Sequence, residues 1–193
     1  MSQICISPPT ILAVTLEQAK LNLRVDGDYL DGLIEIWLQG IIAELEHEIG
    51  QCLMMQTWRV ALPAFAGAIR LPHPAIAITS VKYIDAAGTE QTMASSAYQV
   101  EVQAYKSLLR PALGTCWPRA YVDAFADVGD LPPMVFVELT CGLGNTSDLT
   151  PANIQLYILA KLVEQFDPVT RTERDTVQST YIERLLDACR THS

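Results

Sequence analysis

Residues 28–50 read DYLDGLIEIWLQGIIAELEHEIG and carry the strongest structural signal in the chain. From Leu30 onward, apolar residues recur every three or four positions, which is the spacing of one buried face of an α-helix. Asp28 is a suitable N-cap, and Gly50 lies where a left-handed residue commonly ends a helix. We therefore predict an amphipathic helix over residues 28–49.

Three further helices are expected on either side of this one. Thr15 and Gln18 form a capping-box pattern, in which each side chain can bond the other residue's backbone N–H. Thr150 followed by Pro151 is typical of an N-cap with proline at the first helical position. A second capping-box pattern starts at Thr172. The three predicted ranges are residues 15–24, 151–166 and 172–190.

Between the two pairs of helices the hydrophobic period changes from 3.6 to 2. Trp58, Val60 and Leu62 alternate with Thr57, Arg59 and Ala61, as in a half-buried antiparallel strand. Glycine- and proline-containing turns separate similar short runs. The predicted strands lie within residues 57–62, 68–71, 79–85, 90–93, 98–103, 106–110 and 135–139.

These elements predict a single α+β domain over residues 1–193. Two N-terminal and two C-terminal helices form a small bundle, and an antiparallel β-rich insertion over residues 56–141 lies between them. Residues 114–133, which contain two glycines and three prolines, are expected to form a long surface loop. Loops of this length usually serve a function or contact a partner.

Composition limits the possible functions. Half of the residues are apolar and 18% are charged, so some apolar surface is expected to contact another chain. The net charge of -9 disfavours tight binding to a phosphate backbone. We expect no membrane span and no secretory signal, hence assembly in a reducing cytoplasm. The five cysteines contain no C-x-x-C pair and are expected to be buried apolar residues.

The sequence predicts no catalytic, cofactor-binding or metal-binding residues. The pair His47-Glu48 resembles the start of a zinc motif, but Gln51 stands where the second histidine would be. The glycines at 142 and 144 precede a helix, as in phosphate-binding loops, yet the rest of that fingerprint is missing. We interpret them as a turn that requires a positive φ.

Charge is unevenly distributed along the chain. No Lys or Arg occurs between Arg119 and Lys161, whereas five acidic residues do. Residues 171–193 hold four basic and four acidic residues, so the predicted last helix is neutral and suited to docking.

Several short motifs follow one another in a characteristic order. They are LEQAKLNLRVD at residues 16–26, QTWR at 56–59, LPHP at 71–74, ITSVKYID at 78–85, YQV at 98–100, RPA at 110–112, CWP at 116–118, VELTCG at 137–142 and PANI at 151–154. In this order the chain resembles the head–tail connector (adaptor) proteins of long-tailed bacteriophages and related gene-transfer particles. The resemblance covers roughly residues 8–166.

The resemblance implies a non-enzymatic structural protein of the virion. Such a protein, commonly in twelve copies, forms a ring below the portal, extends the DNA channel and provides the attachment surface for the stopper or tail. Double-stranded DNA passes through the ring transiently, and no cofactor is involved. The chain would be assembled in the bacterial host cytoplasm and reside at the head–tail junction.

Within that role we expect three groups of residues to matter. The subunit-interface candidates are Trp117, Arg119 and Tyr121, whereas Trp37 and Trp58 are expected to fill the monomer core. The portal- or neck-docking candidates are Tyr181, Arg184, Leu185 and Arg190, and deletion of residues 172–193 should block assembly without unfolding the subunit. The lumen-facing acidic candidates are Asp123, Asp127 and Asp130, whose charge would repel the DNA phosphates.

Two alternatives remain open from the sequence. One is another neck component, such as a stopper or tail-completion protein. The other is a small-ligand enzyme with an anion site at residues 142–145.

Overall fold

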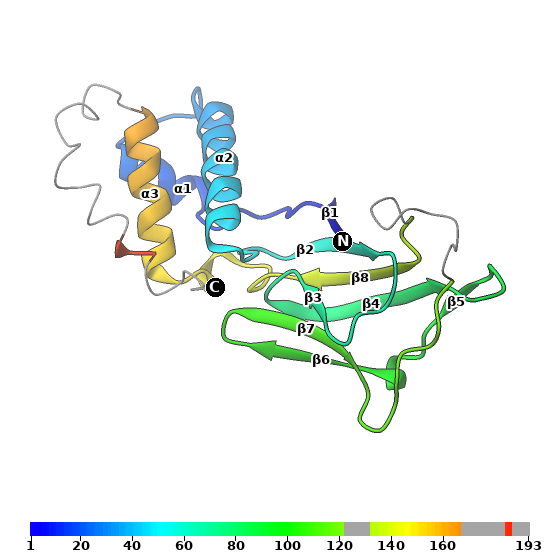
Figure 1. Ribbon diagram of the computed structural model, residues 1–193. Coiled ribbons are helices and arrows are strands. Elements are labelled where there is room, and N and C mark those ends of the chain that lie inside the picture. The colour runs from blue at the N-terminus through cyan, green and yellow to red at the C-terminus, as the bar shows by residue number, and fades with distance from the viewer. Residues whose placement is uncertain (122–131, 167–183, 187–193) are drawn as a thin grey trace. The chain divides into compact units, whose positions relative to one another are not determined.

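The computed structural model describes residues 1–121, 132–166 and 184–186 (Figure 1). The chain divides into two compact units. The first, here called the β unit, comprises Met1–Pro8 and Met55–Gly142. The second, called the helical unit, comprises Pro9–Met54 and the chain from Leu143 onward. The fold is α+β, as the sequence predicts, and every strand of the described residues except the N-terminal β1 is inserted between α2 and α3.

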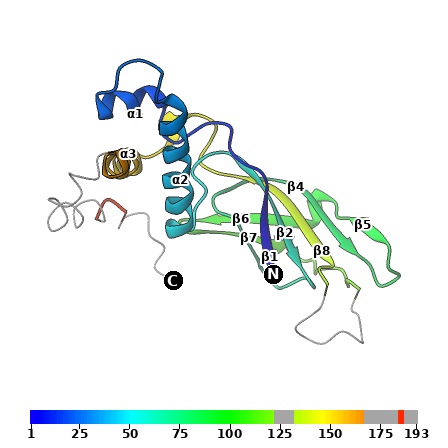
Figure 2. The same cartoon turned by 90° about the horizontal axis from the view of Figure 1, so that it is seen from above.

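Five strands of the β unit form an antiparallel sheet in the order β1-β2-β8-β4-β5 (Figures 1 and 2). Their bounds are Ser2–Ser7 for β1, Gln56–Leu62 for β2, Val135–Cys141 for β8, Ala75–Ile84 for β4 and Glu90–Thr92 for β5. Val60 on β2 lies opposite Val137 on β8, and both are fully buried. The alternating pattern of the sequence therefore places one face of this sheet in the core.

The remaining strands of the β unit form a three-stranded sheet in the order β3-β7-β6. Their bounds are Ile69–Leu71 for β3, Lys106–Pro111 for β7 and Tyr98–Gln103 for β6. Strands β6 and β7 pair along their whole length, from Tyr98 opposite Pro111 to Gln103 opposite Lys106. Ile69 lies opposite Leu109, and both are buried.

Two features of the β unit differ from the prediction. Strand β1 is absent from the sequence-based expectation because its signal is short and its partner β2 lies about fifty residues away. Strand β4 begins at Ala75 rather than at residue 79, and irregular register near Ile76 and Thr79 interrupts the alternation that would have marked it. One of the expected glycine-containing turns lies between β4 and β5, where Gly88 has φ +80°.

The helical unit contains α1 (Leu16–Leu23), α2 (Asp31–Ile49) and α3 (Ala152–Phe166), and each helix packs against the other two. The capping box at α1 is confirmed: Gln18 N–H donates to Thr15 Oγ1 at 3.1 Å, and Thr15 N–H donates to Gln18 Oε1 at 3.0 Å. Gly50 ends α2 in the left-handed conformation, with φ +66°, also as predicted.

The predicted starts of two helices are corrected. Helix α2 begins at Asp31, because residues 28–31 form a turn in which Asp31 N–H donates to the Asp28 carbonyl. Asp28 is therefore not the N-cap. Helix α3 begins one residue later than predicted, and the Thr150 hydroxyl donates to Met54 Sδ at 3.7 Å. The predicted helix over residues 172–190 lies outside the described residues, apart from residues 184–186.

The core of the helical unit is formed by one face of each helix. Its largest fully buried side chains are Ile34, Leu38, Leu45, Ile49, Leu53, Met54, Ile158, Leu162 and Leu186. Trp37 is only half-buried at the margin of this core, where its ring meets Phe166 edge-on at 6.1 Å. None of the helices in the described ranges is both long and apolar enough to cross a membrane.

Candidate interaction surfaces

The only buried histidine among the described residues is His73, in the turn between β3 and β4. Its Nδ1 is hydrogen-bonded to Ser107 Oγ at 3.0 Å, and Ser107 Oγ accepts from Ala75 N–H at 2.9 Å. Burial lowers the pKa of His73, and the nearby Arg70 guanidinium lowers it further, against a raising contribution from a backbone hydrogen bond at Ala104. Ser107 is fully buried, so this pair joins two strands and offers no accessible nucleophile.

The loop proposed as an alternative anion site is engaged in backbone pairing. Gly142 N–H donates to the Pro74 carbonyl at 2.9 Å, and Leu143 N–H donates to the Leu53 carbonyl at 3.0 Å. Gly142 has φ +124°, which confirms the positive-φ interpretation for this glycine, whereas Gly144 does not adopt a positive φ. A 3₁₀ turn, η2 (Ser147–Leu149), separates the loop from α3. The amides of Gly142 and Leu143 are thus unavailable to an anion.

Trp117 is part of an aromatic stack inside the β unit. Its ring lies against Phe65, with centroids 4.8 Å apart and an interplanar angle of 12°, and Phe65 meets Tyr83 edge-on at 5.5 Å. The indole Nε1 is enclosed, and no described residue accepts its hydrogen bond. Trp117 therefore contributes packing within the subunit, and its predicted role between subunits remains a prediction. Trp58 is likewise half-buried rather than a full core residue.

The other two interface candidates follow on the same segment. Ala120 forms a bridge with Asp85, and Tyr121 N–H donates to the Ile84 carbonyl at 2.8 Å. Residues 120–121 are thereby hydrogen-bonded to the end of β4. Arg119 and Tyr121 are exposed, so their side chains are available to a neighbouring chain. Cys116 is exposed as well, contrary to the expectation of a buried thiol, because it lies in the loop after β7.

Of the docking candidates, Arg184 and Leu185 are described, and Tyr181 and Arg190 lie outside the described residues. The Leu185 carbonyl accepts from Asn153 Nδ2 at 2.8 Å, and Leu185 packs against the helical core. Arg184 is exposed. The adjacent Leu186 is fully buried in the core, so deletion of residues 172–193 would remove a core side chain. The expectation that this deletion leaves the subunit intact is therefore corrected.

Acidic residues are concentrated in the helical unit. By sequence it holds fifteen acidic and seven basic residues, whereas the β unit holds seven acidic and six basic ones. The lumen candidates Asp123, Asp127 and Asp130 account for three of the seven and lie outside the described residues. Their placement toward the channel remains a prediction, and outside that loop basic residues are in excess in the β unit.

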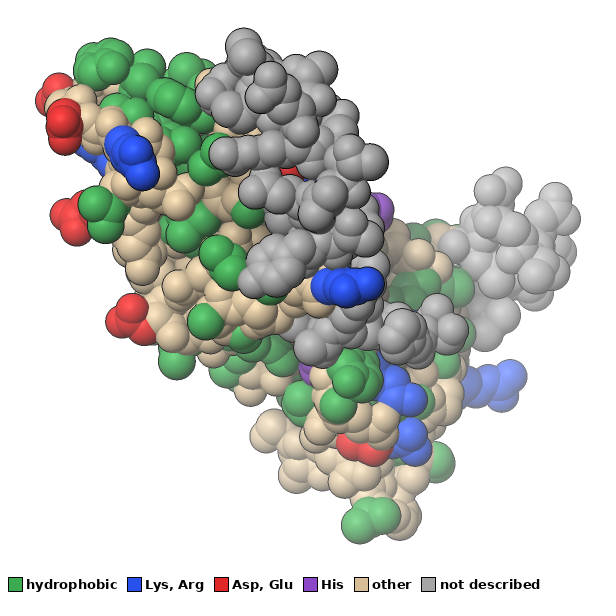
Figure 3. Space-filling view, turned by 90° about the vertical axis from the view of Figure 1, so that its left-hand side faces the viewer, with side chains coloured by type: hydrophobic (Ala, Val, Ile, Leu, Met, Phe, Trp, Pro, Cys, Tyr) green, Lys and Arg blue, Asp and Glu red, His purple; other side chains and the backbone are tan. Residues whose placement is uncertain are grey.

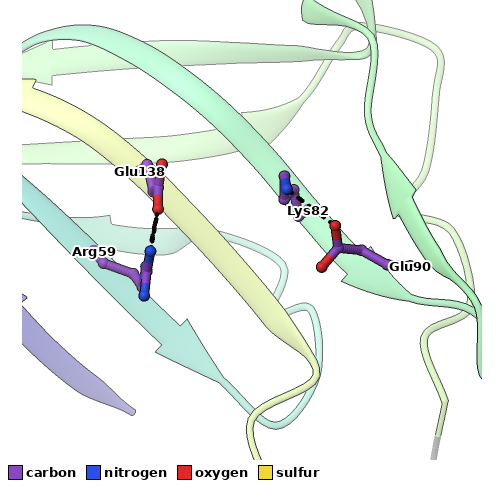
Figure 4. A network of polar contacts seen from close by, with 4 residues as sticks. All are labelled: Arg59, Lys82, Glu90 and Glu138. Carbon is purple, nitrogen blue, oxygen red and sulfur yellow. Dashed lines mark hydrogen bonds and ion pairs between the residues drawn. The ribbon is translucent and has the colours of Figure 1, made fainter.

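Charges on the exposed side of the five-stranded sheet are paired across strands (Figure 4). Arg59 on β2 lies opposite Glu138 on β8, with its Nε 3.0 Å from Oε1 of Glu138. Lys82 Nζ on β4 lies 3.0 Å from Oε1 of Glu90 on β5. Each pair is partly exposed and contributes at most about 1 kcal/mol to stability. This part of the sheet therefore presents little net charge.

Composition predicted exposed apolar surface but not which residues would form it. Figure 3 shows several of them grouped on the side of the molecule that carries helices. In the helical unit they include Leu21, Tyr29, Leu33 and Ile36, which are 82%, 78%, 42% and 65% exposed. In the β unit they include Ile4 and Ile6 on β1 and Val100 and Val102 on β6. A second apolar stripe on the predicted helix, Leu33 and Ile36, was the signal available in the sequence for the first group.

Comparison with solved structures identifies the same fold in chains of three structures. A chain from the neck of an empty gene transfer agent (GTA) particle, computed with C6 symmetry, matches with a TM-score of 0.72 at 18% identity, covering 86% of this chain and 84% of that one. A chain from the virion of the native GTA particle matches with a TM-score of 0.69 at 20% identity, covering 86% and 84%. A chain from the neck of the native particle, computed with C12 symmetry, matches with a TM-score of 0.65 at 19% identity, covering 86% and 83%.

These three solved chains share their fold with the present chain. No protein-family model and no curated protein sequence matches the present chain.

Proposed function

We propose that the protein is a structural subunit of the neck of a phage-like or gene-transfer particle. The observation that carries the proposal is the match of fold over 86% of the chain to chains from GTA necks. Since both units take part in a match of that extent, the likeness is not limited to a common small motif. The order of the sequence motifs supports the same assignment.

Within the neck we infer the role of a ring-forming head–tail adaptor. The C6 and C12 symmetries of the similar necks support a ring of identical copies, with twelve as the expected number. Such a ring would dock below the portal, extend the DNA channel and receive the stopper or tail. Trp117, Arg119 and Tyr121 remain the predicted subunit contacts, and Tyr181, Arg184, Leu185 and Arg190 the predicted docking contacts.

The proposed role requires no catalytic or metal-binding side chains. Among the described residues, no three His, Cys, Asp or Glu side chains come together as metal ligands would. A net charge of -9 per copy suits a wall past which DNA moves without being held, because tight phosphate binding would slow its passage. That Asp123, Asp127 and Asp130 face the channel is a prediction from sequence alone.

Disruption of the gene in a producing bacterium tests the proposal. We expect DNA-filled heads without attached tails, and restoration of tailed particles when the full chain is supplied from a plasmid. Labelling the supplied chain and locating the label by electron microscopy should place it between head and tail. Normal tailed particles in the disrupted strain would contradict the proposal. A label located nearer the tail, in a ring that does not contact the portal, would instead indicate that the chain is a stopper or tail-completion protein.

A further inference from the structure

Strand β1 is an edge strand with neither charge nor proline along its length. Its sequence is SQICIS at Ser2–Ser7. Its pairing with β2 is regular from Ser2 to Cys5 and irregular between Cys5 and Ser7. Ile4 and Ile6 are 61% and 46% exposed. Open edges are templates for pairing with another strand, and natural proteins usually block them with charge, proline, bulges or short length.

Other strands at sheet edges in the described residues differ from β1. Strands β5 and β3 are only three residues long, and each carries a charge, Glu90 and Arg70. The exception is β6, which has six residues, the same length as β1. Val100 and Val102 stand at alternate positions of β6, and their side chains are 37% and 53% exposed. Its one charged residue, Glu101, is paired with Arg110 on β7 at 3.0 Å.

The two open edges lie on opposite sides of the β unit. In Figure 1, β1 runs along the upper side of the five-stranded sheet, and β6 forms the lower side of the three-stranded sheet. Two different, mutually suitable edges allow a heterologous interface, which on repetition forms a ring when the rotation between neighbouring copies closes. An isologous pairing of β1 with β1 would leave β6 unused and would stop at a dimer.

We propose that β1 of one copy pairs edge to edge with β6 of the next copy, which joins the five-stranded sheet of one subunit to the three-stranded sheet of its neighbour. Backbone hydrogen bonds would supply the attraction, and the exposed isoleucines and valines would form a shared apolar strip. No unpaired charge would be buried, because β1 has none and Glu101 keeps its partner. The inference rests on the proposed ring and adds the contact that would hold it.

Photo-crosslinking within assembled particles tests this pairing directly. The full chain with p-benzoylphenylalanine in place of Ile6 is supplied to the gene-disrupted producing strain, and purified particles are irradiated. We expect covalent multimers of this chain whose crosslinked peptides contain residues 98–103. A matched variant carries the same group in place of Ile76, which is 50% exposed on β4, away from both edges in the sheet order. It should give no crosslink to that peptide.

Charge substitution provides the second readout. Ile6→Lys should cause loss of tailed particles, whereas Ile76→Lys should retain them, and circular dichroism of both purified variants should match that of the natural chain. Multimers of this chain with crosslinks at other peptides would overturn the β1–β6 pairing and leave the neck assignment standing. Absence of the chain from particles altogether would overturn both.

Discussion

His73 shows how one side chain joins the two sheets of the β unit. Its Nδ1 is hydrogen-bonded to Ser107 Oγ on β7, and Ser107 in turn accepts from the backbone N–H of Ala75 at the start of β4. Burial at this position disfavours the protonated imidazole and lowers the pKa of His73. The sequence suggested only a histidine between two prolines, because nothing local reveals a partner thirty-four residues away.

The lowered pKa of His73 predicts a pH dependence of stability. The unfolded chain binds a proton at this side chain near pH 6.5, whereas the folded chain resists it down to a lower pH. Below pH 6.5 the unfolded state therefore holds more protons than the folded state. The stability contributed by His73 is full above about pH 6.5 and falls as the pH decreases from 6.5 toward the lower pKa of the folded chain. Urea unfolding between about pH 5 and pH 7.5 measures the effect, with carboxylates contributing mainly at the acidic end. His73→Gln should flatten the slope; an unchanged slope would contradict the assignment.

At the scale of elements, the sequence predicted those whose signal is local. The capping box of α1, the glycine that ends α2, and the alternating residues of β2 and β8 could all be recognised within a few residues. Strand β1 could not, since it is a strand by virtue of pairing with β2. The start of α2 was misplaced because Asp28 uses its carbonyl in a turn instead of capping the helix. The stack of Trp117 on Phe65 likewise depends on a contact between distant segments.

Two glycines of α2 predict opposite responses to the same substitution. Gly40 lies in the helix interior with open space around it, so Gly40→Ala should stabilise the helical unit by about 1 kcal/mol. Gly50 also has open space, but its φ of +66° is strained for alanine, so Gly50→Ala should destabilise by about 1 kcal/mol. Urea unfolding followed by helical circular dichroism measures both. Changes of equal sign would contradict the described end of the helix.

Leu186 predicts that the C-terminal region contributes to the helical core. The side chain is fully buried among α-helical residues, so Leu186→Ala should destabilise the helical unit by about 2–4 kcal/mol through lost contacts and a cavity. Leu185→Ala, at a partly buried neighbouring position, serves as the control and should cost less. Equal stability of Leu186→Ala and the natural chain in the same unfolding experiment would contradict this packing.

At the scale of the whole molecule, net charge differs between the two units. The helical unit carries nearly all of the acidic excess, and the β unit offers two uncharged or charge-paired strand edges. This distribution could be predicted from the sequence, because the insertion expected over residues 56–141 contains every charged residue of the β unit and residues 1–8 carry none. An acidic copy that is joined to its neighbours through neutral edges avoids placing like charges in direct contact.

The most direct measurement is a reconstruction of the particle neck by electron cryomicroscopy at side-chain resolution. The account predicts a closed ring of identical copies of this chain between the head and the tail, around the channel through which DNA passes. A neck without this chain, or with the chain present as a single copy outside the ring, would contradict it.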